Sequence, residues 1–246
     1  MEHCFSGKVC LITGAASGIG RATAARLSSL GAAVALQDID AHRLEETAKL
    51  CTSGTATSSR AFDVGSSGAC DEFATATKRH FGRLDYVFNC AGVNPTAYAL
   101  TDTTDEYYDK LMNTNLRGTY NITRAVIPHM QAGGSIVNTS SIMGLTASAN
   151  MAIYCASKFA IVGFTKAMAM ELGPKQIRVN AIAPGYIDTP TNASVVAGPD
   201  EVAATEKKIA MGRFGTPEEV ADVVAFLFSD ESRYMSGSIV EITGGR

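Results

Sequence analysis

The stretch "VCLITGAASGIG", residues 9–20, decides the fold. Its first four residues are apolar and predict a short buried strand, and three glycines follow within the next turn. Glycine permits a tight turn and lets the following segment, which has a helical pattern over 18–30, pack closely on the strand. A strand joined by such a turn to a helix is the opening unit of a doubly wound parallel sheet.

The rest of the chain repeats this alternation of apolar runs and helical patterns. Apolar strands separated by helices indicate a parallel sheet that is covered on both faces. We therefore expect an α/β protein with a three-layer, doubly wound sheet of about seven strands, in one domain over 1–246. Its ligands should bind beyond the carboxyl ends of the strands. The predicted strands are 9–12, 33–36, 59–62, 86–89, 135–138, 178–182 and 238–242, and the predicted helices are 18–30, 40–51, 67–81, 105–130, 152–172 and 217–229.

Charge and composition argue against several classes of protein. The formal net charge is −3 at pH 7, which gives no general attraction to nucleic acid or to an anionic membrane. No apolar run approaches the ~18 residues of a membrane span, and we expect a soluble, cytoplasmic protein. The six cysteines form no C-x-x-C pair and the four histidines are scattered, so we expect no metal site.

The glycine turn and the next strand end suggest a nucleotide site. Gly14, Gly18 and Gly20 would let backbone approach a pyrophosphate at the start of a helix, although such turns also serve as plain connections. Asp38 ends the next strand, where a carboxylate accepts hydrogen bonds from ribose hydroxyls and repels a 2′-phosphate. This favours NAD over NADP. The alternatives are that Asp38 only forms a turn, and that the nearby Arg21 and Arg43 accept NADP.

Tyr154 and Lys158 lie four residues apart at the start of a predicted helix, so both side chains can face one site. A cation about 4.5 Å from a phenol lowers its pKa by about 2.7 at an effective dielectric constant of about 20. Taken alone, the pair is most simply a polar start to a buried helix. Ser141, thirteen residues earlier, offers a hydroxyl to a substrate carbonyl, and Asn115 is an unusual residue within a helical pattern.

Together these residues resemble the short-chain dehydrogenase/reductase family. The resemblance covers essentially the whole chain and implies a Rossmann fold. The sequence departs from the family pattern at Cys90, where a second Asn is usual, and at Thr243, where an acid commonly precedes Gly-Gly. The matching elements, in order, are "TGAASGIG", "NCAG", Asn115, Ser141, "YCASK", "PGYIDTP" and "GTPEEVADVVAFLFSDESRYMSG".

The resemblance implies a catalytic set. Tyr154 would exchange a proton with the substrate oxygen, and Lys158 would lower the Tyr154 pKa and hold the cofactor ribose. Ser141 would orient the carbonyl or alcohol, and Asn115 would hold a water that links Lys158 to solvent. Hydride would pass between nicotinamide and substrate. The implied cofactor-binding residues are Gly14, Ser17, Gly18, Ile19, Gly20, Asp38, Ile39, Asp63, Val64, Asn89, Ala91, Gly92, Tyr154, Lys158, Pro184, Gly185, Ile187 and Thr189.

The segment 189–215 is long and mixed in polarity, which suits a lid over the substrate. The predicted substrate residues carry few charges and favour a neutral, fairly hydrophobic alcohol or ketone. The small residues of 156–169 and the family resemblance lead us to expect a homotetramer, with a homodimer as the alternative. The predicted substrate residues are Asn94, Pro95, Ser141, Met143, Ala149, Tyr154, Tyr186 and Val195.

Three functions stay open at this point. The first is an NAD(H)-dependent alcohol dehydrogenase or ketoreductase. The second is an enzyme of the same fold redirected to a non-redox step, as an isomerase, dehydratase or cyclase. The third is a non-catalytic dinucleotide-binding protein, which the set Asn115, Ser141, Tyr154 and Lys158 argues against.

Overall fold

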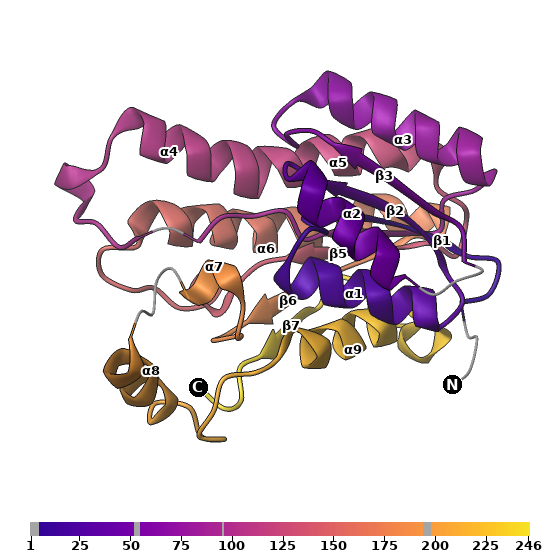
Figure 1. The fold of residues 1–246 in the computed structure, drawn as a ribbon. Helices are drawn as coiled ribbons and strands as arrows, with labels where there is room; N and C mark the ends of the chain where they lie inside the picture. Colours follow the sequence, from indigo (N-terminus) through magenta and orange to yellow (C-terminus); the bar gives the residue numbers. More distant parts are fainter. Residues whose placement is uncertain (1–4, 52–54, 95, 194–197) are drawn as a thin grey trace.

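The computed structural model describes residues 5–51, 55–94, 96–193 and 198–246. Seven parallel strands form one sheet in the order β3-β2-β1-β4-β5-β6-β7 (Figure 1). The expected doubly wound α/β fold, with its seven strands, is confirmed. The strands are β1 Val9–Thr13, β2 Ala33–Asp38, β3 Thr57–Ala61, β4 Tyr86–Asn89, β5 Ser135–Thr139, β6 Arg178–Pro184 and β7 Ile239–Ile242.

Helices cover both faces of the sheet and bury its apolar residues. Residues of α1, α2 and α9 pack on one face, with Leu27, Leu44 and Val224 in that core. Residues of α3, α5 and α6 pack on the other face, with Phe73 and Ile122 in the second core. The helices are α1 Gly18–Ser29, α2 Ala41–Leu50, α3 Ser67–Phe81, α4 Asp105–Leu111, α5 Gly118–Val126, α6 Ala152–Leu172, α7 Pro190–Ala193, α8 Pro199–Glu206 and α9 Pro217–Phe228.

None of the helices described is both long enough and apolar enough to cross a membrane.

The edge strand β3 begins at Thr57, two residues before its predicted start. It pairs with β2 from Val34 opposite Thr57 to Asp38 opposite Ala61. Three of its five residues are exposed, because an edge strand has a neighbour on one side only. The apolar pattern that locates a central strand is therefore missing here, and only the pairing with β2 fixes the strand.

The predicted helix 105–130 is divided into pieces. Between α4 and α5, residues Met112–Arg117 form a π-helical turn, and Ile127–His129 form a 3₁₀ turn after α5. Pro128 has no N–H to donate, so the backbone hydrogen bond that would continue α5 at this position cannot form. The π-helical turn carries Asn115, which is 1 % exposed. Such turns occur frequently at functional sites.

The predicted lid, 189–215, contains two helices that the sequence pattern did not reveal. α7 follows Thr189, and α8 begins with Pro199 and two acids in its first turn. Proline at this position presets the helical φ, and the acids complement the positive end of the helix dipole.

At the amino ends of the strands, one buried carboxylate joins β1 to the entry of β4. Asp85 is 3 % exposed, and its Oδ2 accepts a hydrogen bond of 3.0 Å from the Val9 N–H. The Arg83 guanidinium donates to both carboxylate oxygens, at 2.8 and 2.6 Å, and Lys8 Nζ lies 3.7 Å away. This carboxylate compensates a backbone donor that is out of reach of solvent.

We expect Asp85→Ala to lower the free energy of unfolding by about 2–4 kcal/mol, because it leaves the Val9 N–H buried without an acceptor. Urea denaturation measures this difference. The control is Asp71→Ala, since the Asp71 carboxylate is 56 % exposed and lies 4.0 Å from Arg124. Equal losses in the two variants would contradict the assigned role.

Candidate active site

The turn between β1 and α1 is held in a conformation that only glycine fits. Gly14 and Gly18 have φ of +67° and +48°. A Cβ on Gly20 would lie 2.0 Å from the Gly14 carbonyl oxygen, and one on Gly14 would lie 2.8 Å from the Ala91 backbone. The turn therefore brings the start of α1 against the ends of β1 and β4. The free N–H groups at this helix start suit a phosphate.

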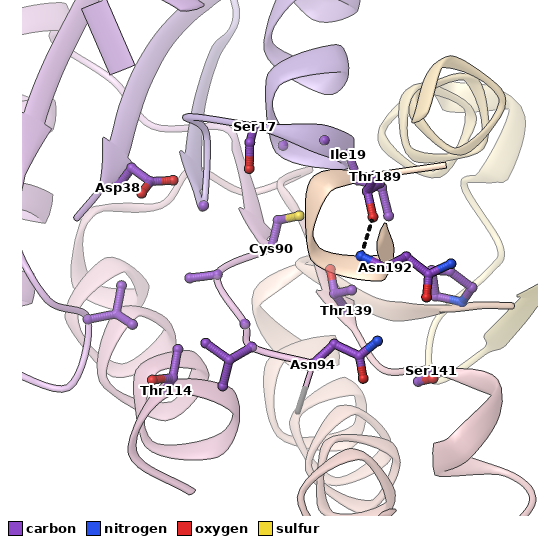
Figure 2. A pocket seen from close by; sticks show the side chains of 18 of the residues that line it. Ser17, Ile19, Asp38, Cys90, Asn94, Thr114, Thr139, Ser141, Thr189 and Asn192 are labelled. Atoms are coloured by element: carbon purple, nitrogen blue, oxygen red, sulfur yellow. Dashed lines mark hydrogen bonds between the residues drawn. The ribbon is translucent and has the colours of Figure 1, made fainter. Parts of the chain in front are cut away.

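Asp38 fixes this turn from the end of β2. Its Oδ2 accepts a hydrogen bond of 2.9 Å from Ala16 N–H, and its Oδ1 accepts bonds from the N–H groups of Ile39 and Asp40 at 2.7 and 3.1 Å. The side chain lines the cavity described below. The carboxylate is thus both a structural acceptor and a negative charge at one end of the site (Figure 2).

The two arginines near Asp38 are occupied by other groups. The Arg21 guanidinium donates to the Ala16 carbonyl, at 2.6 Å from Nη2, and pairs with Glu46 at 3.0 Å. Arg43 lies 3.7 Å from Asp40. Neither arginine lines the cavity.

One cavity of about 570 Å³ runs along the carboxyl ends of the strands. In Figure 2, Asp38 lies toward one side of it and Ser141 toward the other, with Ser17, Ile19 and Thr189 near the glycine turn. Its volume and its glycine cradle fit a dinucleotide. The predicted site residues that line it are Gly14, Ser17, Gly18, Ile19, Gly20, Asp38, Ile39, Asp63, Val64, Ala91, Gly92, Asn94, Ser141, Tyr154, Lys158, Pro184, Gly185, Ile187 and Thr189.

Tyr154, Lys158 and Ser141 face this cavity from α6 and from the end of β5. All three are buried, with exposed fractions of 8 %, 4 % and 8 %. The Lys158 ammonium donates to the Thr139 carbonyl at 3.0 Å and lies 5.8 Å from the centre of the Tyr154 ring. A hydrogen bond from Ser140 Oγ to the Lys158 carbonyl, at 2.9 Å, joins β5 to the helix. The predicted pair is therefore brought together at one wall.

Burial dominates the protonation of the pair. It raises the pKa of the Tyr154 phenol above its usual value, and the hydrogen bond with the Ser141 side chain opposes this. Burial also lowers the pKa of Lys158 to about 8. The sequence predicts the opposite direction for Tyr154. The difference arises because burial penalises the phenolate and also weakens the charge on its cationic neighbour.

Asn115 lies behind the wall of the cavity. Its Oδ1 accepts from the Val93 N–H at 2.8 Å, and its Nδ2 donates to the Val93 carbonyl at 3.1 Å and to Ser157 Oγ at 3.3 Å. A Cβ on Gly92 would lie 3.3 Å from Asn115 Oδ1 and 3.5 Å from Lys158 Nζ. The asparagine thus holds the segment after β4 close to Lys158.

Other predicted residues do not line the cavity. Asn89 Nδ2 donates to Asn138 and Thr123, at 2.9 and 3.1 Å, so its amide joins β4 to β5 and α5. Met143 packs against a cluster of Leu111, Ile153 and Tyr154. Ala149 is exposed, and the Tyr186 ring stacks on Phe214. Pro95 and Val195 lie outside the described residues.

The structure adds residues that the sequence did not single out as site residues. Several of them are sequence neighbours of predicted site residues at the end of a strand. Lys110, Thr114 and Asn192 have no such neighbour or motif that would have marked them as site residues. Asn192 reaches the site because its Nδ2 donates to the Ile187 carbonyl at 3.1 Å and its N–H to Thr189 Oγ1 at 3.2 Å. The added lining residues are Gln37, Phe62, Cys90, Val93, Lys110, Thr114, Thr139, Ser140 and Asn192.

A cavity that joins a phosphate-sized glycine cradle to a buried phenol and amine suits hydride transfer with a nicotinamide dinucleotide. In the part of the chain that the structure describes, no group of three His, Cys, Asp or Glu side chains could hold a metal ion. These features place the protein in the class of dinucleotide-dependent oxidoreductases.

Comparisons with known proteins define the class further. A family model described as enoyl-(acyl carrier protein) reductase matches residues 14–246. The chain is 40% identical over 242 residues to 3-oxoacyl-[acyl-carrier-protein] reductase FabG of Thermotoga maritima, with 97% of each chain covered. The chain belongs to the short-chain dehydrogenase/reductase family.

Two solved structures share the fold over almost the full length. A short-chain dehydrogenase from Burkholderia cenocepacia in complex with NADP has a TM-score of 0.92 at 33% identity, with 98% of each chain covered. Carveol dehydrogenase from Mycobacterium avium in complex with NAD has a TM-score of 0.94 at 31% identity, with 98% of this chain and 97% of that chain covered.

The buried ammonium of Lys158 should reduce stability at neutral pH. A lysine with a lowered pKa in the folded state destabilises the fold fully below that pKa, and the penalty is relieved as pH rises from about 8 toward the unfolded value. We therefore expect Lys158→Met to raise the free energy of unfolding at pH 7 by about 1–3 kcal/mol. The increase should be smaller at pH 10, where the wild-type lysine is largely neutral in the folded protein.

The control is Lys49→Met, whose side chain is exposed in the last turn of α2. Urea denaturation at pH 7 and pH 10 supplies the measurement. A gain that is absent at pH 7, or that does not change with pH, would contradict the buried-charge explanation.

Proposed function

We propose that the protein is an NAD(H)-dependent oxidoreductase that transfers hydride between the cofactor and a secondary alcohol or ketone. The observation that carries the proposal is that Ser141, Tyr154 and Lys158 line the same cavity as the glycine turn. A cofactor bound along the turn would reach these side chains at its nicotinamide end. The nicotinamide would supply the hydride acceptor or donor.

The chain's own groups have distinct roles in this proposal. Tyr154 exchanges a proton with the substrate oxygen, and Ser141 donates a hydrogen bond to that oxygen as negative charge develops. Protonated Lys158 binds ribose hydroxyls, and the positive charge of an oxidised nicotinamide would oppose the effect of burial on Tyr154 by favouring the phenolate. Asn115 holds the wall beside Lys158 and the water through which protons reach solvent.

The cofactor preference follows from the charges around Asp38. Its carboxylate lies on the cavity wall, while Arg21 and Arg43 are engaged with Glu46 and Asp40. A 2′-phosphate would meet the negative charge of Asp38, and neither Arg21 nor Arg43 lines the cavity beside it. Known relatives include complexes with NADP and with NAD, so the preference rests on these side chains.

The substrate in this proposal is neutral and fairly hydrophobic. The wall near the catalytic group includes Val93 and Ile187, together with the uncharged amides of Asn94 and Asn192. The alternatives are a non-redox reaction as an isomerase, dehydratase or cyclase, and a non-catalytic role. The buried catalytic set favours the redox reaction.

We propose a homotetramer, with a homodimer as the alternative. The outer face of α6 carries apolar residues that are exposed in the single chain, among them Phe159 at 45 % and Met170 at 82 %. Ala156, Gly163 and Ala167 lie on the same exposed face and would allow a second helix to approach closely.

A screen of secondary alcohols and ketones with NAD(H) and NADP(H), followed at 340 nm, tests the proposed reaction. On any active substrate, Tyr154→Phe should lower kcat by about 100- to 10,000-fold, because the ring keeps its packing and loses the proton donor. Cofactor affinity should stay within a factor of two. Retained turnover in Tyr154→Phe would place the proton donor elsewhere, and silence of the wild-type protein despite cofactor binding would favour the alternatives.

The cofactor preference has its own test. The wild-type protein should bind NADH more tightly than NADPH. Asp38→Ala should lower the ratio of the NADPH Kd to the NADH Kd about tenfold, because it removes the charge that repels the 2′-phosphate. Fluorescence titration measures both affinities. Asp38→Asn, which keeps an acceptor for the turn, should act in the same direction, while Glu45→Gln on the exposed face of α2 should have no effect. A wild-type preference for NADPH would reject the role of Asp38.

A further inference from the structure

The segment Thr243–Arg246 folds back on the turn that follows β6. Thr243 Oγ1 accepts hydrogen bonds from the N–H groups of Gly245 and Arg246, at 3.3 and 3.5 Å. Gly244 and Gly245 have φ of +66° and +84°, which side chains rarely adopt. The hydroxyl of Thr243 and the two glycines therefore form a tight bend directly after β7.

This bend contacts two other parts of the chain. On one side, the N–H groups of Ala210 and Met211 donate to the carbonyls of Gly245 and Gly244, at 3.2 and 3.0 Å. A Cβ on Gly244 would lie 2.9 Å from Ile209, so the approach is close. On the other side, a Cβ on Gly185 would lie 3.1 Å from Thr243 Cα. The bend is packed between the segment 209–211 and the turn that lines the cavity.

Arg246 completes this arrangement through an aromatic ring. Its guanidinium carbon lies 4.9 Å from the centre of the Tyr186 ring, and that ring also stacks on Phe214 with centroids 5.6 Å apart. The Tyr186 side chain does not line the cavity, but its sequence neighbours Gly185 and Ile187 do. Fixing the ring fixes the backbone between these two wall residues.

The segment 213–216 is itself held firmly. Gly215 N–H donates to the Tyr186 carbonyl at 3.0 Å, and the Gly215 carbonyl accepts from Asp188 N–H at 2.8 Å. The Glu219 carboxylate accepts from Arg213 at 2.6 and 2.9 Å and from Thr216 N–H at 2.8 Å. Tyr186 thus packs on a rigid neighbour in Phe214, and Arg246 is the second partner that the described residues provide for its ring.

We propose that Arg246 is a positioning residue that acts through Tyr186 on the turn Pro184–Thr189. By holding the ring, it keeps Gly185 and Ile187 at the wall against which the nicotinamide half of a dinucleotide would lie. The inference rests on the proposed dinucleotide function. It makes the nicotinamide end of the site, and not the adenosine end at Asp38, sensitive to Arg246.

We expect Arg246→Ala to raise the Kd for NADH about two- to fivefold, the range of a partly exposed cation–aromatic contact. The Kd for ADP, which lacks the nicotinamide half, should not change. Arg246→Lys keeps a cation over the ring and should restore most of the affinity for NADH. Isothermal titration gives these values, and Arg233→Ala, whose side chain contacts the Asp230 carbonyl on the surface, is the control.

A double-mutant cycle separates this role from a general effect on folding. In a Tyr186→Leu background, Arg246→Ala should no longer change the affinity for NADH. In the otherwise wild-type protein, Arg246→Ala should leave the thermal unfolding midpoint unchanged. The inference would be overturned if Arg246→Ala weakened the binding of NADH and ADP equally, or changed neither affinity. It would also be overturned if Arg246→Ala still weakened NADH binding in the Tyr186→Leu background. Binding of ADP but not NADH by the wild-type protein would reject the dinucleotide function itself, and the inference with it.

Discussion

The absence of a side chain at Gly20 is the constraint on which the rest of the structure depends. A Cβ there would lie 2.0 Å from the Gly14 carbonyl, so α1 could not begin directly beneath the end of β1. That close approach places the free N–H groups of the helix at the carboxyl edge of the sheet. Asp38 then accepts from Ala16 N–H and ties the turn to β2. One steric condition therefore positions the helix, the neighbouring strand end and the free N–H groups at the helix start.

Burial of Lys158 and Tyr154 at this edge of the sheet disfavours the charged form of each side chain. Lys158 is surrounded by protein, and the one hydrogen bond described for its ammonium is to the Thr139 carbonyl. Burial lowers the pKa of Lys158, so we expect the charged form to be less favourable in the folded protein than in the unfolded chain. The raised pKa of Tyr154 has the same origin. In the proposed reaction, the group that exchanges a proton is thus held where its charged form is disfavoured, a common relation in active sites.

The sequence predicted most of this fold because its central strands are buried on both sides. β4 has the predicted bounds, and β1, β5 and β6 begin at their predicted first residues. β3 differed because an edge strand needs no apolar pattern, and α8 was missed because Thr205 is its one buried residue, which leaves no apolar face to reveal the helix. The predicted residues that reach the cavity follow strands or open helices. Tyr186 and Asn89 do not, because their side chains are engaged in packing and hydrogen bonds that adjacency in sequence does not reveal.

The π-helical turn at Met112–Arg117 has a consequence for protein design. A π-helical turn has a wider hydrogen-bonded ring than an α-helical turn, so it accommodates an extra residue and changes the direction in which later side chains point. Asn115 lies in this turn with its amide on Val93. A designer who shortened the segment by one residue to obtain a regular helix would improve the local geometry and rotate Asn115 away from the wall beside Lys158. The irregular turn is the feature that a redesign of this scaffold has to preserve.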